Sequence, residues 1–202
     1  APITERAVND PLNDALAELT GQTSPIGLNQ ILASIKKAKK DDRIKGIYLE
    51  SGMLSAGYAT TEEIRNALLD FKTSGKFVYS FAPIYSQKAY YLATAADKVY
   101  MNPTGMLEFK GLSSVHTFFK GTLEKLGVEV QVFKHGHYKS AVEPFILESM
   151  SDSARVQTET YLNSMWDHLL NKMAEARGVT AQSLDQTASL MPMFREDSLL
   201  IA

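Results

Sequence analysis

Lys139 is the residue whose type and setting most strongly suggest chemistry. It lies in the stretch FKHGHYKSAVEPF, residues 133–145, between a β-branched and aromatic run and a short helix-like run. Because Phe133, Tyr138 and Phe145 flank it, we expect its amine to be partly desolvated. Burial and the start of a helix both disfavour an ammonium, and a neutral lysine can take a proton from a serine hydroxyl. Most lysines are solvated surface groups. Burial therefore separates the two interpretations: a lysine that acts as a base should be partly buried, and a purely structural one should be exposed.

Other kinds of site find less support in the sequence. His135 and His137 share one side of an extended backbone and could chelate a metal, but further ligands do not follow at a recognisable spacing. The glycines of ESGMLSAG, residues 50–57, fit neither dinucleotide nor P-loop spacing. Four scattered histidines give no Ser–His–acid triad, and the absence of cysteine excludes a thiol nucleophile. We therefore expect neither a metal nor a cofactor.

Composition narrows the class of protein and of partner. The chain has 202 residues, 45% hydrophobic and 22% charged, which is ordinary for a globular domain. A formal net charge of −2 gives no field suited to nucleic acid, so we expect no such partner. No apolar run approaches the roughly 18 residues that span a bilayer. The chain starts APITERAVND, without an initiator Met or a signal-peptide pattern, so we interpret it as a piece of a longer protein.

Strand patterns and helix patterns alternate along the chain, and these elements could position Lys139. Short β-branched strand patterns are expected at 43–50, 77–82, 98–102, 106–109 and 128–133. Helices are expected at 28–40, 59–76, 86–97, 115–127, 151–178 and 180–191. This alternation predicts an α/β fold with right-handed crossovers and a mostly parallel sheet flanked by helices. We expect a mobile leading segment over 1–27, with one short helix within 10–25, followed by a single domain over 28–202.

Local signals set the expected ends of these elements. Thr60 and Glu63 have the spacing of a capping box, and Gly75 is expected to stop the same helix. The Pro-Thr-Gly at 103–105 is expected to close the strand at 98–102. The long helix at 151–178 carries an apolar face that must pack on the sheet or on another chain. That face comprises Leu162, Met165, Trp166, Leu169, Leu170 and Met173.

Three stretches resemble a known family in order along the chain. They are DDRIKGIYLE, FKTSGKFVYSFAPIYSQKAYYLATAADKVYMNP and GTLEKLGVEVQVFKHGHYKSAVEPF. The chain is similar over about 28–178 to the signal peptide peptidase A (protease IV) family. The resemblance implies a Clp protease/crotonase-like fold of repeated β-β-α units. It also implies Ser–Lys proteolysis of cleaved signal peptides in the bacterial envelope.

The resemblance assigns roles residue by residue. Lys139 matches the family's general-base lysine, but Gln87 stands where the family has its nucleophilic serine. Ser86 is one residue away, about 100° of rotation on a helix, which aims its hydroxyl elsewhere. MLSA, residues 53–56, replaces the glycine-containing oxyanion turn. These departures resemble the N-terminal domain of the long two-domain form, whose C-terminal domain supplies serine and oxyanion hole.

The resemblance also implies partners and a location. Peptide substrates, the C-terminal domain of the same protein and a homo-oligomer, a tetramer, are expected. We also expect a location at the inner membrane, facing the periplasm, with membrane association through a segment outside this chain. Two alternatives stay open: a non-catalytic crotonase-like scaffold for oligomerisation or peptide binding, and a self-contained dyad of Ser86 with Lys139. Ser140 and Tyr138 either orient Lys139 or serve as packing residues.

Overall fold

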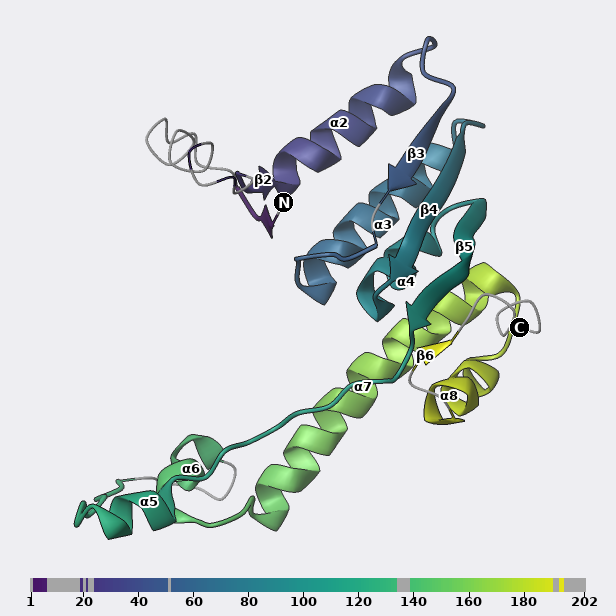
Figure 1. The fold of residues 1–202 in the computed structure, drawn as a ribbon. Coiled ribbons are helices and arrows are strands. Elements are labelled where there is room, and N and C mark those ends of the chain that lie inside the picture. Colours follow the sequence, from purple (N-terminus) through teal and green to yellow (C-terminus); the bar gives the residue numbers. More distant parts are fainter. Residues whose placement is uncertain are drawn as a thin grey trace. The chain divides into compact units, whose positions relative to one another are not determined.

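The computed structural model describes residues 2–6, 19, 21, 24–50, 52–133, 139–190 and 193–194. The chain divides into two compact units, here called the first unit (1–110 with 172–202) and the second unit (111–171). The expectation of a single domain over 28–202 is not tested by this division and stays a prediction. Figure 1 shows both units and labels most of their elements.

A mostly parallel sheet forms the centre of the first unit. Its strand order is β3-β4-β5-β6, with β3 to β5 parallel and β6 antiparallel to β5. The strands are β3 Gly46–Glu50, β4 Phe77–Tyr85, β5 Lys98–Glu108 and β6 Met193–Phe194. A separate parallel pair comprises β1 Ile3–Thr4 and β2 Ile26–Gly27. The predicted α/β class with a parallel sheet flanked by helices is confirmed.

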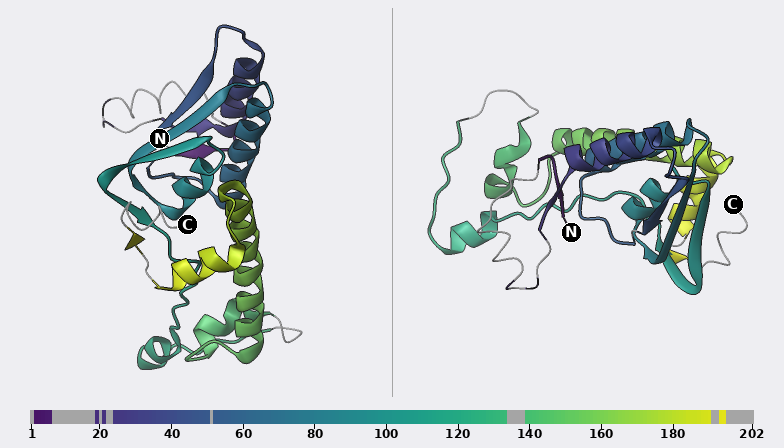
Figure 2. Two further views of the ribbon diagram at one scale, coloured as in Figure 1. Left: turned by 90° about the vertical axis from the view of Figure 1, so that its right-hand side faces the viewer. Right: turned by 90° about the horizontal axis from the view of Figure 1, so that it is seen from above.

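Helices connect the strands and cover one face of the sheet. They are α2 Leu28–Lys40, α3 Tyr58–Lys72 and α4 Gln87–Ala93. In Figure 2, α2 and α3 lie side by side. The core beneath them comprises Ile64, Leu68, Phe71, Val78, Leu92 and Ala95, with Ile31, Ile35, Ile47 and Leu49 partly buried against it. Along β4, Val78, Ser80 and Ala82 are buried while the alternate residues are more exposed, as a strand covered on one face requires.

Two local predictions for the first unit are wrong. The capping box fails because α3 already begins at Tyr58, so Thr60 lies inside the helix, and Gly57 caps it without a side-chain bond. The Pro-Thr-Gly at 103–105 does not end a strand, since β5 runs through it to Glu108 with a register shift opposite 82–84. An added Cβ on Gly105 would lie 2.6 Å from Pro83 O, so a glycine allows this close approach.

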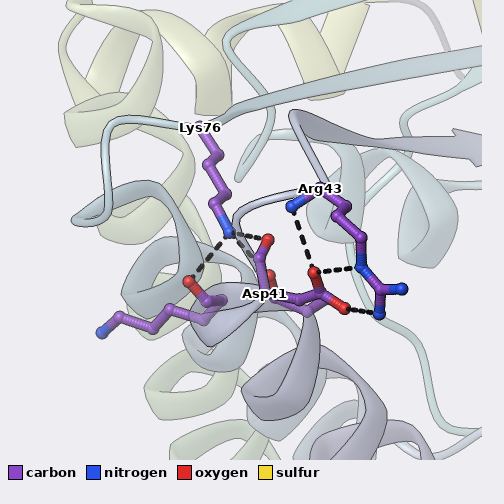
Figure 3. A network of polar contacts seen from close by, with 5 residues as sticks. Asp41, Arg43 and Lys76 are labelled. Carbon is purple, nitrogen blue, oxygen red and sulfur yellow. Dashed lines mark hydrogen bonds and ion pairs between the residues drawn. The ribbon is translucent and has the colours of Figure 1, made fainter.

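A polar network closes the C-terminus of α2 (Figure 3). Lys76 Nζ donates to the carbonyl oxygens of Ala38, Lys39 and Asp41 at 2.8–2.9 Å. Arg43 donates to the Asp41 carboxylate through its backbone N–H, Nε and Nη2. These Arg43 bonds hold the pKa of Asp41 at about 2, below its usual 3.8. The network thus satisfies helix-end carbonyls that have no partner within the helix.

The second unit is mainly helical and holds two further corrections. Its elements are α5 Lys120–Lys125, a 3₁₀ turn Ser140–Val142, α6 Glu143–Ile146 and the first part of α7 Asp152–Arg177. The helix expected at 115–127 is reduced to α5. The strand expected at 128–133 does not form, because no strand pairs with it among the residues that the structure describes.

The C-terminal helices match their predicted positions. The helix predicted at 151–178 is α7, and that at 180–191 is α8 Ala181–Leu190. Leu169, Leu170 and Met173 on the predicted apolar face of α7 are buried. None of the described helices combines the length and the apolarity that a membrane crossing requires. Most of the short helix expected within 10–25 lies outside the described residues.

Candidate active site

The side chain of Gln87 is held by two hydrogen bonds at the carboxyl end of β4. Gln87 is the first residue of α4 and is only 7% exposed. Its Nε2 donates to Tyr58 Oη at 3.0 Å, and its Oε1 accepts from the Lys110 backbone N–H at 2.9 Å. The amide therefore joins α3, α4 and the segment that follows β5. It has no nucleophilic chemistry, and its groups already bind the protein itself.

Ser86 serves as the N-cap of α4. Its hydroxyl oxygen accepts a hydrogen bond from Ala89 N at 3.3 Å, and its own N–H donates to Gly52 O at 2.8 Å. A serine in this role satisfies one of the backbone N–H groups left open at a helix start. The geometry accounts for Ser86 as a capping residue, which speaks against the self-contained dyad.

The turn at 52–56 uses its carbonyl groups to hold the first unit together. Gly52 O accepts from Ser86, Ser55 O accepts from Ile3 N at 3.0 Å, and Ala56 O accepts from Lys88 Nζ. The same ammonium lies 5.4 Å from the centre of the Tyr58 ring. An oxyanion hole instead needs N–H donors directed at one point. The described contacts of this turn are those of a structural connection.

Lys139 lies in the second unit, immediately before the 3₁₀ turn that starts at Ser140, and it is exposed. Phe133 is 97% exposed and Phe145 is 46% exposed, so the apolar flanks do not bury the amine within this chain. The expectation of partial burial is wrong for the chain as described, because neighbours in sequence desolvate a group only when they pack over it. Tyr138 lies outside the described residues.

Glu143 is a residue of the same motif that the sequence reasoning missed. Its carboxylate is buried and accepts from Ser151 N at 3.1 Å and from Ser151 Oγ at 2.7 Å. It thereby fixes the segment after Lys139 to the residue before α7. The signal was available, since an acidic residue in the apolar run SAVEPF needs partners if it is buried. The stacked rings of Phe119 and Phe145, with centroids 6.2 Å apart, add a second contact to the same segment.

The histidine pair that could chelate a metal, His135 and His137, lies in a part of the chain that is not described. Among the residues that the structure does describe, no three His, Asp or Glu side chains gather closely enough to hold a metal ion.

Comparison with known proteins places this geometry in context. Residues 70–199 match the model of peptidase family S49. Protease 4 of Haemophilus influenzae is 37% identical over 169 residues, which are 82% of this chain and 28% of that protein. Protease 4 of Salmonella typhi is 36% identical over 78% of this chain and 26% of that protein. The chloroplastic serine protease SPPA of Arabidopsis thaliana is 33% identical over 80% and 24%. The chain spans about a quarter of the length of these relatives.

Proposed function

Since the chain belongs to peptidase family S49, we propose that it is the N-terminal domain of a bacterial envelope serine protease that degrades cleaved signal peptides with a Ser–Lys dyad. Lys139 is the general base, and the nucleophilic serine lies in the C-terminal domain of the same protein. This chain alone is inactive. One observation supports the division: the Lys139 motif is present, whereas a buried, hydrogen-bonded Gln87 stands at the nucleophile's position.

In the proposed reaction, Lys139 Nζ takes the proton from the serine hydroxyl as the serine oxygen attacks the peptide carbonyl. The lysine then gives the proton to the leaving amine, and water releases the acyl group by the reverse sequence. A lysine takes up a proton only as its neutral amine, and desolvation favours that form. In the proposed enzyme the partner domain therefore covers Lys139. The exposure of Lys139 in this chain fits a half-site that is completed from outside.

The setting of the enzyme forms part of the same proposal. Its substrates are signal peptide remnants, and it assembles as a homo-oligomer, a tetramer. It acts at the inner membrane, on the side facing the periplasm, and a segment outside this chain provides membrane association. No nucleic acid takes part.

The test is a peptidase assay of the full-length protein with Lys139→Ala. We expect turnover to fall by about 10²–10⁴-fold, the range for loss of a general base. Lys125→Ala is the matched control, because it removes a lysine near the end of a short helix of the same unit. Circular dichroism should show the same folded content in both variants. Wild-type turnover in Lys139→Ala would contradict the proposal.

The exposure of Lys139 also favours a second candidate, a crotonase-like scaffold for oligomerisation or peptide binding. In that case Lys139→Ala keeps full turnover, and the loss of this domain changes assembly or peptide binding instead. The self-contained dyad predicts activity of this chain alone and its loss in Ser86→Ala. The capping role of Ser86 argues against peptidase activity of this chain alone.

A further inference from the structure

Residues 128–133 have the sequence of a strand but no partner strand among the described residues of their own unit. Val128, Val130 and Val132 alternate with Glu129, Gln131 and Phe133, a period of two that suits a strand with one apolar face. All but Val132 are exposed. Within the described part of the chain, the only backbone hydrogen bond from this stretch joins Val128 N to Leu123 O at 2.9 Å. The remaining backbone groups are open to pairing with another chain or domain.

The sheet of the first unit has the complementary feature, an open edge. On the side of β5 away from β4, described strands pair only with Leu107 and Glu108, through β6. The preceding part of β5, residues 98–106, has no strand beside it there among the described residues. In a progression of β3, β4 and β5 joined by helices, the next parallel strand belongs at this edge. The stretch 128–133 follows α5 and so has the place in the chain that is expected of such a strand.

Strand direction decides where such a strand would deliver Lys139. At its carboxyl end β4 leads directly into Ser86 and Gln87, the nucleophile's position. A strand added parallel to β5 ends at that same end of the sheet, about 10 Å from β4, because neighbouring strands lie about 4.8 Å apart. Lys139 follows Phe133 by six residues. Parallel addition thus brings the lysine to the catalytic end, whereas antiparallel addition brings it to the opposite end.

We propose that residues 128–133 are a docking strand that extends the parallel sheet of the serine-bearing domain and so delivers Lys139 to its serine. This rests on the proposed function and specifies how the two domains engage. Val128, Val130 and Val132 continue the helix-covered apolar face of the partner sheet, and Glu129, Gln131 and Phe133 lie on its other face. Backbone hydrogen bonds provide the affinity, as in other cases of strand addition.

The identity of the partner follows from Gln87. If the docking strand paired with the sheet of this chain or of a second copy, Lys139 would meet an amide already bonded to Tyr58 and Lys110. Only a domain with a serine at that position makes the delivery productive. The relatives also have room for such a domain, since this chain spans about a quarter of their length.

Hydrogen exchange in the full-length protein tests the proposal directly. We expect the amides of 128–133 to exchange at least about a hundredfold more slowly than in an unstructured peptide, because strand pairing protects them. Val130→Pro should abolish this protection and lower turnover at least tenfold, since proline has no N–H for the ladder. The matched control is Val115→Pro. Val115 is 90% exposed in the same unit, in a stretch without regular structure, and its variant should keep turnover within twofold.

The partner is identified by a benzoyl-phenylalanine photo-crosslinker at Gln131. We expect crosslinked peptides from the serine-bearing domain. Crosslinks to 98–106 of this chain or of a second copy would overturn the proposal, as would fast exchange of 128–133 in the wild-type protein.

Lys139→Ala separates this inference from the proposed function. An inactive Lys139→Ala variant with fast exchange at 128–133 would refute docking alone. A fully active variant with slow exchange would refute the general-base role alone.

Discussion

Two buried tyrosines of the first unit, Tyr85 and Tyr91, offer a matched test of hydrogen bonding. Tyr85 and Tyr91 are both at most 1% exposed. Tyr85 Oη shares a hydrogen bond with Ser80 Oγ at 2.9 Å and donates to Tyr100 O at 3.3 Å. Tyr91 Oη, by contrast, is buried without a hydrogen-bond partner, the one such side-chain atom among the described residues. Replacement of each by phenylalanine should therefore change stability in opposite directions.

The magnitudes follow from the price of burying a polar group. An unsatisfied buried hydroxyl costs about 1–3 kcal/mol, so Tyr91→Phe should raise the free energy of unfolding by about 1 kcal/mol. The Tyr91 ring keeps its contacts: Arg65 Cζ lies 5.2 Å from its centroid, and the centroid of the Tyr58 ring lies 6.4 Å from it. Tyr85→Phe should lower it by about 1–3 kcal/mol, because buried Ser80 then loses its partner. Burial raises the pKa of both tyrosines, so neither substitution removes a charge at pH 7.

Urea unfolding at pH 7, followed by circular dichroism, measures both changes. An unchanged slope against urea shows that a shifted midpoint reports stability rather than altered compactness. We expect the Tyr91→Phe midpoint to lie above wild type and that of Tyr85→Phe below it. If both midpoints fall by similar amounts, the Tyr91 hydroxyl has a partner in solution, and the reasoning from its isolation is refuted.

Two further predictions concern a charge and a close contact. The Arg43 hydrogen bonds lower the pKa of Asp41 to about 2 in the folded chain, so their stabilisation is present above about pH 3.8 and is lost as pH falls through 2. Asp41→Asn should lower the thermal midpoint at pH 7 but not near pH 2; an equal loss at both pH values would contradict this. Gly52→Ala should cost about 2 kcal/mol or more, since the added Cβ would lie 2.2 Å from Ile84 O. The control Gly57→Ala meets nothing within 4 Å, and urea titration compares the two.

Sequence patterns predicted the elements whose signals are local. The helix at 28–40 has the predicted bounds because apolar periodicity and a terminal basic cluster define it without distant contacts. The strand predicted at 98–102 is too short, because Pro-Thr-Gly at 103–105 is a turn signal in sequence. Pairing with β4 nevertheless carries β5 through it to Glu108. The capping box failed for a similar reason, since its spacing occurs by chance inside a helix that starts earlier.

The candidate site shows the same division between local and distant information. A motif that is continuous in sequence predicts Lys139 as the base, and this assignment stays a prediction. The role of Gln87 could not be predicted, because its partner Tyr58 lies 29 residues before it and its other partner, Lys110, lies 23 residues after it. The burial expected for Lys139 is not found, because Phe133 is almost fully exposed and Phe145 about half exposed in this chain.

In the proposed function Gln87 stands at the nucleophile's position, and this bears on how stability and reactivity are distributed. A nucleophile must stay exposed to substrate and free of competing hydrogen bonds, which costs stability at the start of α4. Gln87 reverses both conditions, because it is buried and joins Tyr58 to Lys110. Lys139 shows the opposite balance, with an exposed side chain and apolar neighbours that lack a covering layer. In the proposed function, the chemistry of this lysine depends on a surface of the C-terminal domain, so variants that weaken docking should abolish turnover while leaving the first unit folded.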